Sequence, residues 1–306
     1  MDKKIAFLGT PSFAVPILKS VYKSDYKISC VFSQPPRKSN RGYKLNKSPI
    51  HTVSEELGIK IKTPDKIENE IEYIKSLNLD LAIVVAYGQI LSEDILGLSK
   101  NGFINVHASL LPKWRGAAPI QRSIINMDKT TGLSIMKIIP KLDEGPVCKK
   151  YSVDILENEN AKSLSDRLSE LAAEKILINI ENILQQKASF EEQDSLSATY
   201  AKKIQKIEGK INWNDGADEI LAKINGLYPQ PGAWFFFENN RHKILRATLS
   251  KTTMRPGEII DDELTISCGN KSIKVTEIQR EGKKPQKTRD FLLGSKLKKG
   301  IILKNE

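Results

Sequence analysis

An amide, an imidazole and a carboxylate in this chain are the side chains that an acyl transfer needs. Asn105 and His107 are separated by one residue, and Asp143 follows further along the chain. Asparagine can donate to a developing oxyanion, histidine can move a proton near neutral pH, and aspartate can orient that histidine. Because residues two apart on a strand point to one face, Asn105 and His107 can reach one reacting centre. A lone Asn-x-His pair more often has a structural role in a loop, so the surrounding elements decide between the two interpretations.

The first half of the chain alternates strand patterns with helix patterns. The continuous β-branched run Leu81–Ala86 predicts a central strand covered on both faces. The other predicted strands are Ile5–Leu8, Ile28–Ser33, Lys60–Lys62, Phe103–Val106 and Gly132–Ile138, and the predicted helices are Phe13–Tyr22, His51–Leu57 and Leu164–Leu184. Strands that alternate with helices indicate a parallel α/β sheet, in which ligands bind outside the carboxyl ends of the strands. Asn105 and His107 lie at such an end, which favours the catalytic interpretation.

The turn after the first predicted strand is not a phosphate loop. Gly9-Thr10-Pro11-Ser12 matches neither G-x-G-x-x-G nor G-x-x-x-x-G-K-[ST], and Pro11 removes one backbone donor. We therefore interpret this stretch as a helix-opening turn and expect no nicotinamide cofactor.

The pattern changes in the last third of the chain. Residues from about 186 to 208 are polar and are the best candidate for a linker. Beyond them, five short strands are predicted at Ala233–Phe237, Lys243–Leu249, Gly257–Ile260, Leu264–Ser267 and Ile273–Gln279. Short strands at this spacing suggest a small antiparallel barrel of the OB type. We expect a catalytic domain over 1–188, a linker over 189–207 and a basic OB-like domain over 208–306.

The positive charge of the chain is unevenly distributed. Of the net charge of +11, residues 1–200 contribute 27 Lys and Arg against 24 Asp and Glu, whereas residues 201–306 contribute 21 against 13. Such an excess favours a surface that faces a polyanion, and nucleic acid rather than a membrane, because no amphipathic anchor is evident. A solvated lysine-rich surface would give the same count.

Several classes of protein are disfavoured by what the sequence lacks. No apolar run approaches the roughly 20 residues of a membrane helix, and the apolar stretch near the N-terminus is too short for a signal peptide. Cys30, Cys148 and Cys268 are far apart and lack metal-ligand spacing. We expect a cytoplasmic protein with reduced cysteines, no metal and no membrane contact.

Taken together, the motifs resemble those of the methionyl-tRNA formyltransferase family over almost the whole chain. The matching segments are Asn105-x-His107, Ser109-Leu110-Leu111-Pro112, Trp114-Arg115-Gly116-Ala117-Ala118-Pro119-Ile120, Asp143, Gly9-Thr10-Pro11-x-Phe13-Ala14, Arg41-Gly42-x-Lys44-Leu45, Thr199-Tyr200-Ala201-x-Lys203-Ile204 and Ile211-Asn212-Trp213. The resemblance implies a Rossmann-like N-terminal domain that moves a formyl group from 10-formyltetrahydrofolate to the α-amino group of methionyl initiator tRNA. It also implies a C-terminal OB-like barrel that helps to hold the tRNA, and a monomer.

The resemblance implies a role for each matching residue. Asn105, His107 and Asp143 would be catalytic. The folate site would include Ser109, Leu110, Leu111 and Pro112, and a basic loop carrying Arg41 and Lys44 would reach the tRNA. In the reaction, Asn105 would donate to the oxyanion, His107 would protonate it or the departing folate nitrogen, and Asp143 would relay the proton that the amine loses.

The chain departs from the family pattern in two places. Asn40 and Tyr43 replace a frequent Gly and a frequent Lys, so the basic loop carries less charge. Glu144-Gly145-Pro146 follows Asp143 where Thr-Gly-Asp or a similar sequence is common, although the carboxylate of Asp143 itself is present.

Two other functions remain open at this stage. One is a formyltransferase for glycinamide ribonucleotide or an amino sugar nucleotide, although the former would be shorter with a Gly-Ser-rich phosphate loop, and the latter usually lacks a basic barrel of this size. The other is an RNA-binding protein that keeps the fold without the activity. A protein that only binds RNA has no use for Asn105, His107 and Asp143 together and should not bind a folate analogue.

Overall fold

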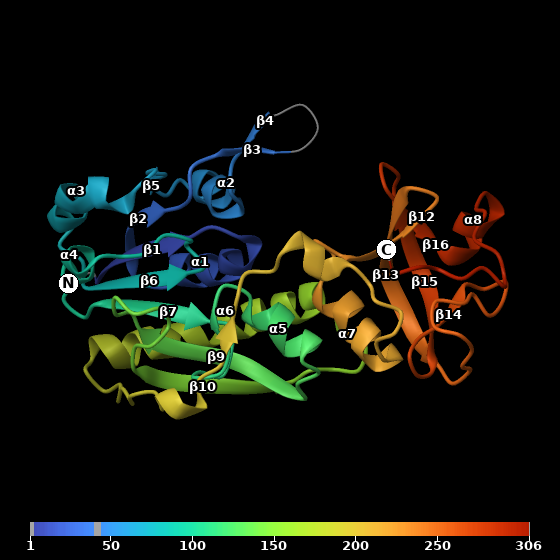
Figure 1. The fold of residues 1–306 in the computed structure, drawn as a ribbon. Helices are drawn as coiled ribbons and strands as arrows, with labels where there is room; N and C mark the ends of the chain where they lie inside the picture. The colour runs from blue at the N-terminus through green and yellow to red at the C-terminus, as the bar shows by residue number, and fades with distance from the viewer. Residues whose placement is uncertain (1–2, 40–43, 306) are drawn as a thin grey trace. The chain divides into compact units, whose positions relative to one another are not determined.

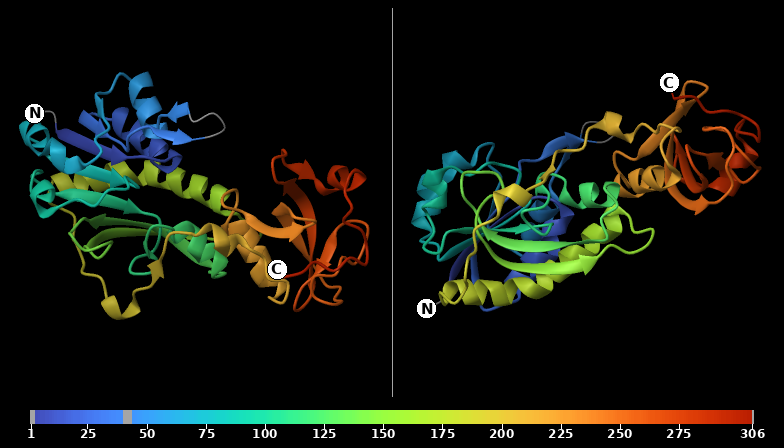
Figure 2. Two further views of the ribbon diagram at one scale, coloured as in Figure 1. Left: turned by 45° about the horizontal axis from the view of Figure 1, so that its top comes forward. Right: turned by 60° about the horizontal axis from the view of Figure 1, so that its bottom comes forward.

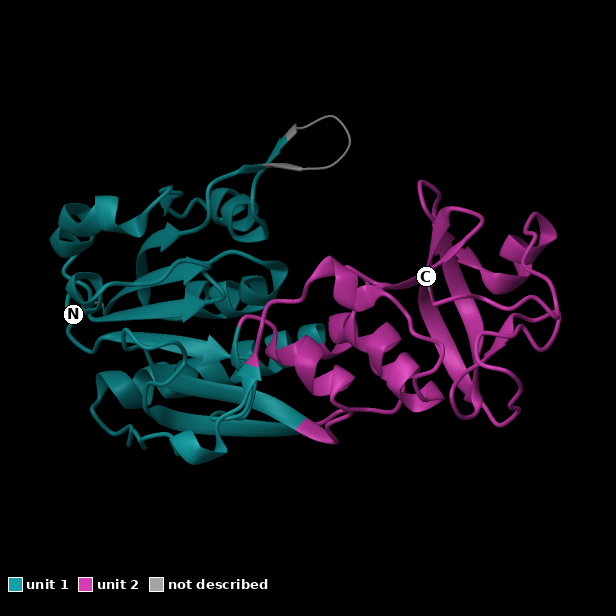
Figure 3. Cartoon of the chain, viewed as in Figure 1, with its two compact units in different colours: residues 1–116, 131–153, 165–200 teal, residues 117–130, 154–164, 201–306 magenta. Residues whose placement is uncertain are grey.

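The chain folds into two compact units in a computed structural model that describes residues 3–39 and 44–305 (Figure 3). The first unit comprises residues 1–116, 131–153 and 165–200, and the second comprises residues 117–130, 154–164 and 201–306. Two short segments, residues 117–130 and 154–164, thus group with the C-terminal part of the chain. The domain boundaries predicted from the sequence remain a prediction.

A seven-stranded sheet forms the centre of the first unit (Figure 1). Its strands, in spatial order, are β10 (Val147–Asp154), β9 (Thr130–Lys137), β7 (Phe103–His107), β6 (Leu81–Val85), β1 (Lys4–Gly9), β2 (Lys27–Phe32) and β5 (Ile61–Lys62). The pairs from β7 through β6, β1 and β2 to β5 are parallel, whereas β9 is antiparallel to β7. The sheet is therefore mixed and Rossmann-like, which corrects the expectation of a parallel sheet.

Strand β9 runs antiparallel to β7. Between the two strands the chain forms helix α5 (Pro119–Ile125). The chain then enters β9 at the carboxyl end of β7, with Ser134 opposite His107 and Lys137 opposite Ile104. It therefore does not make the crossover to the amino ends of the strands that a parallel pairing would require.

Hydrophobic burial explains why these segments form strands. Every residue of β6 is buried, as its continuous apolar run predicts. In β1, Ala6 and Leu8 pack in one cluster with Ile67 and Ile74. Because alternate strand residues point to opposite faces, the fully buried Phe7 faces the other layer. Both faces of the sheet are therefore covered at β1 and β6.

Helices and short connecting strands surround the sheet. The helices are η1 (Ser12–Ala14), α1 (Val15–Tyr22), α2 (Pro49–Glu56), η2 (Ile67–Glu70), α3 (Ile71–Ser76), α4 (Glu93–Leu96), α6 (Ala161–Leu184) and η3 (Ser195–Ser197), and the short strands are β3 (Arg37–Ser39), β4 (Lys44–Asn46), β8 (Arg115–Gly116) and β11 (Tyr200–Ala201). Strand β10, helices α3, α4 and α5 and these four short strands lie outside the segments predicted from the sequence.

Two of these helices show how local sequence sets an element. Helix α2 begins after Ser48, whose hydroxyl oxygen accepts from the His51 N–H at 3.0 Å, with Pro49 at the first position. Helix α6, the long yellow-green helix in Figure 2, lies beside α1: the Ser20 hydroxyl donates to the Ala173 carbonyl at 2.7 Å. Leu164, Leu168, Ile176 and Ile180 form its buried stripe, as the helical spacing predicts.

The second unit contains an antiparallel sheet. Its strands are β12 (Ala233–Phe237), β13 (Asn240–Ser250), β15 (Ser272–Arg280) and β14 (Thr265–Ser267) in that order, with β16 (Gln286–Lys287) also paired to β15. The predicted strand Gly257–Ile260 makes only isolated bridges, through Glu258 and Ile259. The remaining elements are η4 (Lys206–Gly209), α7 (Ala217–Gly226) and α8 (Thr288–Leu293). The core packs Trp213 edge-to-face against Phe235 and includes Ile220 and Ile224 of α7.

Within residues 3–39 and 44–305, no helix is both long enough and apolar enough to cross a membrane.

Candidate active site

The last residues of β7 carry the first two candidate side chains. Val84 of β6 pairs with Asn105 on one side, and Met136 of β9 pairs with it on the other. Phe103, Ile104 and Val106 are buried and fix this strand in the sheet. Asn105 is half-buried, and its side-chain amide makes no hydrogen bond to another residue within 3–39 or 44–305. An uncommitted amide donor therefore stands at the carboxyl end of a central strand.

His107 is held from one side by a backbone carbonyl. Its side chain is only 6% exposed, and Nε2 lies 2.9 Å from the carbonyl oxygen of Trp114. A carbonyl can only accept, so Nε2 carries the proton of this bond. Nδ1 lies 3.7 Å from Oδ2 of Asp143, which is an ion-pair separation and longer than a hydrogen bond. Nδ1 is thus the ring nitrogen that is available to a reacting group.

Asp143 reaches this position through an unusual backbone conformation. Its φ is +52°, in the left-handed region that few residues other than Gly, Asn and Asp adopt. Oδ2 accepts a hydrogen bond of 2.8 Å from the Gly116 N–H, which fixes the carboxylate beside His107. At Gly145 a Cβ atom would overlap the carbonyl oxygen of Lys137. The loop Glu144-Gly145-Pro146, which departs from the family pattern, therefore still needs its glycine.

The structure brings His107 and Asp143 together and leaves Asn105 two residues away on the same strand. Strand β9 ends at Lys137, opposite Ile104. The loop that follows must therefore fold back along the sheet to bring Asp143 to the carboxyl end of β7.

The segment Ser109–Pro112 forms a tight loop directly after the strand. The Ser109 hydroxyl donates to the Lys113 carbonyl at 2.6 Å, and the Ser109 carbonyl accepts from the Ser134 hydroxyl at 2.7 Å. Leu111 is buried against Met136 and Val147. The Ser109 hydroxyl is thus occupied by the backbone of its own loop. Leu110 and Pro112 are the members of this segment that are half-buried.

Sequence reasoning missed a neighbouring loop, residues 86–91, which follows β6. It begins two residues after Val84, the partner of Asn105. Ala86 and Gly88 have φ values of +47° and +88°, and the Ile90 side chain is 81% exposed. A Tyr-Gly pair directly after a buried β-branched run was the available signal. The loop places an exposed apolar side chain at the same edge of the sheet as His107.

Tyr87 anchors the loop after β6 through its buried side chain and its backbone carbonyl. Its side chain is buried, its backbone carbonyl accepts from the Thr10 hydroxyl at 2.7 Å, and desolvation raises the pKa of its phenol. The turn at Thr10, interpreted from the sequence as a helix opening, thus also supports the loop after β6.

The basic loop predicted to reach tRNA is described only in part. Arg41 lies outside the described residues. Lys44 belongs to β4, where its backbone pairs with Ser39 of β3.

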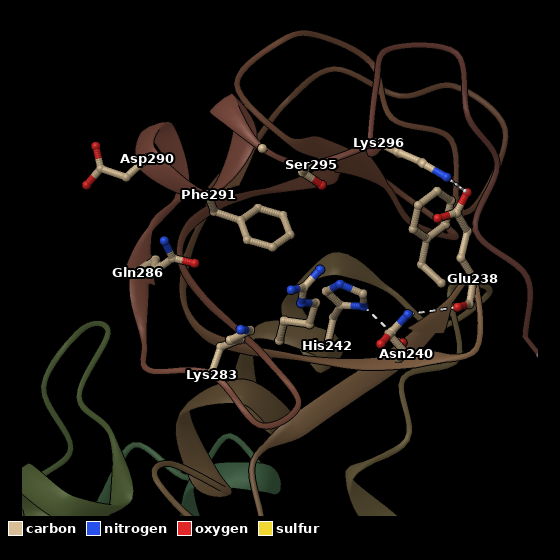
Figure 4. Close-up of a pocket in the computed structure, with 12 residues that line it drawn as sticks. Glu238, Asn240, His242, Lys283, Gln286, Asp290, Phe291, Ser295 and Lys296 are labelled. Carbon is tan, nitrogen blue, oxygen red and sulfur yellow. Dashed lines mark hydrogen bonds and ion pairs between the residues drawn. The ribbon is translucent and has the colours of Figure 1, made fainter.

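A separate cavity of about 390 Å³ lies within the second unit (Figure 4). His242 lines it, is 3% exposed, and its Nδ1 lies 3.0 Å from the Asn240 carbonyl oxygen. Phe237 and Phe291 contribute aromatic edges, and the other lining residues are Glu238, Arg280, Lys283, Gln286, Asp290, Gly294, Ser295 and Lys296. The cavity contains none of the candidate catalytic residues. Among the residues that the structure describes, no cluster of three His, Cys, Asp or Glu side chains could hold a metal ion.

The sequence of this chain is similar to those of known formyltransferases. A family profile described as formyl transferase matches residues 3–180, and one described as formyl transferase, C-terminal domain, matches residues 203–296. The methionyl-tRNA formyltransferase of Pelagibacter ubique (strain HTCC1062) is 58% identical, over 100% of both chains. The methionyl-tRNA formyltransferase of Caulobacter vibrioides (strain NA1000 / CB15N) is 42% identical, over 98% of this chain and 99% of that one.

Two solved structures share the fold at low identity. HypX from Aquifex aeolicus in complex with tetrahydrofolic acid gives a TM-score of 0.69 at 14% identity, covering 95% of this chain and 47% of HypX. This chain therefore spans about half the length of HypX. WlaRD, a sugar 3N-formyl transferase, gives a TM-score of 0.68 at 19% identity, covering 93% of this chain and 100% of WlaRD.

Proposed function

The chain belongs to the methionyl-tRNA formyltransferase family, and we propose that it transfers the formyl group of 10-formyltetrahydrofolate to the α-amino group of methionyl initiator tRNA. The product, N-formylmethionyl-tRNA, starts translation, so the activity belongs to the cytoplasm. The observation that carries this proposal is the placement of His107 against Asp143 beside the uncommitted amide of Asn105, at the carboxyl end of β7.

The reaction needs a neutral amine and a stabilised oxyanion. A free α-amino group has an ordinary pKa of about 7.7–8.0, so a neutral fraction is present near pH 7 without a strong base. Its nitrogen attacks the formyl carbon, a C–N bond forms, and the carbonyl oxygen becomes negative. The Asn105 amide donates to this oxygen, and a positioned donor of this kind is worth roughly 2.7–4 kcal/mol in acyl transfer.

His107 and Asp143 then move the proton. The attacking amine loses a proton, and N10 of the folate must gain one as its bond to the formyl carbon breaks. With Nε2 committed to Trp114, Nδ1 of His107 is the nitrogen that exchanges this proton. When the ring is protonated at both nitrogens, the Asp143 carboxylate at 3.7 Å stabilises the cation.

We assign the folate to the edge formed by the loops after β6 and β7. Half-buried Leu110 and Pro112 and exposed Ile90 supply apolar contacts for a pteridine ring. Ser109 and Leu111 stabilise the loop itself, through the hydroxyl hydrogen bond of Ser109 to the Lys113 carbonyl and the burial of Leu111. HypX, which shares the fold, has been solved with tetrahydrofolic acid.

The second unit is proposed to bind the tRNA as an OB-like domain, with the protein acting as a monomer. Residues 201–306 carry 21 Lys and Arg against 13 Asp and Glu. Arg280 and Lys283 are exposed and line the cavity that His242 also lines, where they can contact phosphate. Lys283 is labelled in Figure 4. Arg41 and Lys44 are proposed to contact the acceptor end.

The test is formylation of charged initiator tRNA by the purified protein with 10-formyltetrahydrofolate. Free methionine and a His107→Ala variant are run in parallel. We expect formylation of the charged tRNA only, and its loss in the variant. Consumption of the folate with glycinamide ribonucleotide or an amino sugar nucleotide, but not with tRNA, would instead identify a small-molecule formyltransferase.

A further inference from the structure

The polar segment Glu191–Thr199, predicted to lie in the linker, holds both sides of the candidate active site. At one end, Glu191 and Val147 exchange backbone hydrogen bonds of 2.8 and 3.0 Å, just beyond the loop that carries Asp143. At the other end, the Thr199 carbonyl accepts from the Arg115 N–H at 2.8 Å. We call this segment the strap.

Thr199 also fixes the residue that holds His107. Its hydroxyl oxygen accepts from the Trp114 N–H at 2.9 Å, and its own N–H donates to the Pro112 carbonyl at 3.3 Å. The Trp114 carbonyl in turn accepts from Nε2 of His107. One end of the strap therefore sets the position of the hydrogen-bond partner of His107.

Between these ends, a single glutamine joins the loop of Asp143 to the loop of Arg115. Nε2 of Gln193 donates to the carbonyl oxygens of Asp143 and Gly145, at 2.8 and 2.7 Å. Its Oε1 accepts from Nε of Arg115 at 3.0 Å. Because a guanidinium can only donate, it fixes which end of the amide faces each loop.

The Arg115 side chain is almost completely buried, which is unusual for an arginine. It is 2% exposed, and Nη1 lies 3.6 Å from Oε1 of Glu144, the residue after Asp143. A buried arginine must be paired to offset its desolvation. Its partners here are Gln193, which bonds to the Asp143 loop, and Glu144, which belongs to that loop. Among the described residues, its Nη2 has no hydrogen-bond partner.

We propose that Gln193, oriented by Arg115, is a positioning residue for formyl transfer, and that the strap holds both partners of His107. The inference rests on the proposed function. Asp143 adopts a left-handed backbone conformation that the surrounding structure must maintain. The two hydrogen bonds from Gln193 to the carbonyls on either side of Glu144 supply that restraint and keep the carboxylate facing Nδ1.

The experiment compares Gln193→Met, which keeps the size but loses the hydrogen bonds, with Gln185→Met at an exposed glutamine of the same unit. Misplacement of a catalytic group by about 1 Å costs on the order of 100-fold in rate. We expect kcat to fall about 10- to 100-fold in Gln193→Met, with KM for both substrates within about 3-fold. In an Asp143→Asn background, Gln193→Met should add less than about 3-fold, since its target is already lost.

A second readout does not depend on activity. The chain has three histidines, so each ring resonance can be assigned with His51, His107 and His242 variants. Gln193→Met should move the ring resonances of His107 and leave the other two in place, even if the parent protein fails to formylate tRNA and the proposed function falls. Unchanged kcat together with unchanged His107 resonances overturns the proposal, as does a full additive loss in the Asp143→Asn background.

If Gln193→Met disturbs all three histidines, the strap is tested at Thr199. Thr199→Val removes the oxygen that accepts from Trp114, while Thr199→Ser retains it. We expect Thr199→Val to lower kcat about 3- to 10-fold and to move the His107 resonances, with Thr199→Ser close to the parent. Equal behaviour of the two variants overturns the proposal.

Discussion

Each unit of the molecule buries a histidine, and the two sites differ in what faces the ring. His107 is 6% exposed and His242 is 3% exposed, so burial does not distinguish them. Both rings also have one nitrogen within hydrogen-bond distance of a backbone carbonyl, of Trp114 and Asn240 respectively. At His107 the other nitrogen faces the Asp143 carboxylate. At His242, aromatic rings surround the imidazole.

The surroundings of His242 make it part of the core. Its ring stacks on Phe235 at a centroid distance of 5.5 Å and meets the edges of Phe237 and Phe291. Burial lowers the pKa of His242, and the Arg280 charge lowers it further, against the opposing hydrogen bond to Asn240. The comparison indicates that a carboxylate facing the ring, rather than burial, distinguishes the histidine that we propose for proton transfer.

The largest expected effect is the loss of kcat on substitution of His107, which substitution of His242 should not cause. A positioned acid or base contributes about 10²- to 10⁴-fold, so His107→Ala should lower kcat by about three orders of magnitude. His242→Leu should leave kcat within about 3-fold, since its ring supports packing only. Single-turnover formylation at saturating substrates measures both. A comparable loss in His242→Leu, with the protein still folded, would remove the distinction.

Removal of the amide beside His107 should have the next largest effect. Asn105→Ala deletes the proposed oxyanion donor, for which losses of about 10²- to 10³-fold in kcat are typical. Because the donor acts on charge that develops only in the transition state, KM for the charged tRNA should stay within about 3-fold. Steady-state kinetics with varied tRNA decides this, and a change confined to KM would assign Asn105 to binding.

The cations at the His242 cavity should affect tRNA binding rather than chemistry. A double Arg280→Ala, Lys283→Ala variant should raise KM for the charged tRNA by about 10-fold. In a plot of the logarithm of the tRNA association constant against the logarithm of the salt concentration, the slope should become shallower by about one unit for each lost phosphate contact. The matched control is Lys19→Ala, Lys23→Ala, which removes two exposed charges from the first unit. Equal changes in both variants would show a general charge effect and no site.

The smallest expected effect concerns stability at low pH. The pKa of His242 is lowered in the folded state, so below its unfolded value of about 6.5 the unfolded chain binds more protons than the folded one. The stability that neutral His242 contributes is therefore present above this pH and is lost as the pH falls towards the folded value. His242→Leu should flatten the fall in urea midpoint between about pH 7.5 and about pH 5.5. An unchanged slope would assign the acid sensitivity to other groups.

Sequence pattern alone was sufficient for features that depend on neighbouring residues. The apolar run of β6 predicted a strand that is buried throughout, and the Asn105-x-His107 spacing predicted two side chains at one strand end. Burial periodicity and strand alternation are local properties, so a short window of residues contains them. Strands β12, β13, β14 and β15 of the second unit were predicted for the same reason. Strand β16 was not predicted, and the predicted strand Gly257–Ile260 forms only isolated bridges.

Tertiary structure decided everything that depends on segments far apart in the chain. A polar composition fits a solvated linker as well as a strap, and only the fold shows that Gln193 bonds to the carbonyls of Asp143 and Gly145. The antiparallel direction of β9, the burial of Arg115 and the approach of Asp143 to His107 are likewise decided by chain closure. Hydrogen bonds between distant segments form only once folding has brought them together, so residue type and spacing within a short window do not reveal which partners will meet.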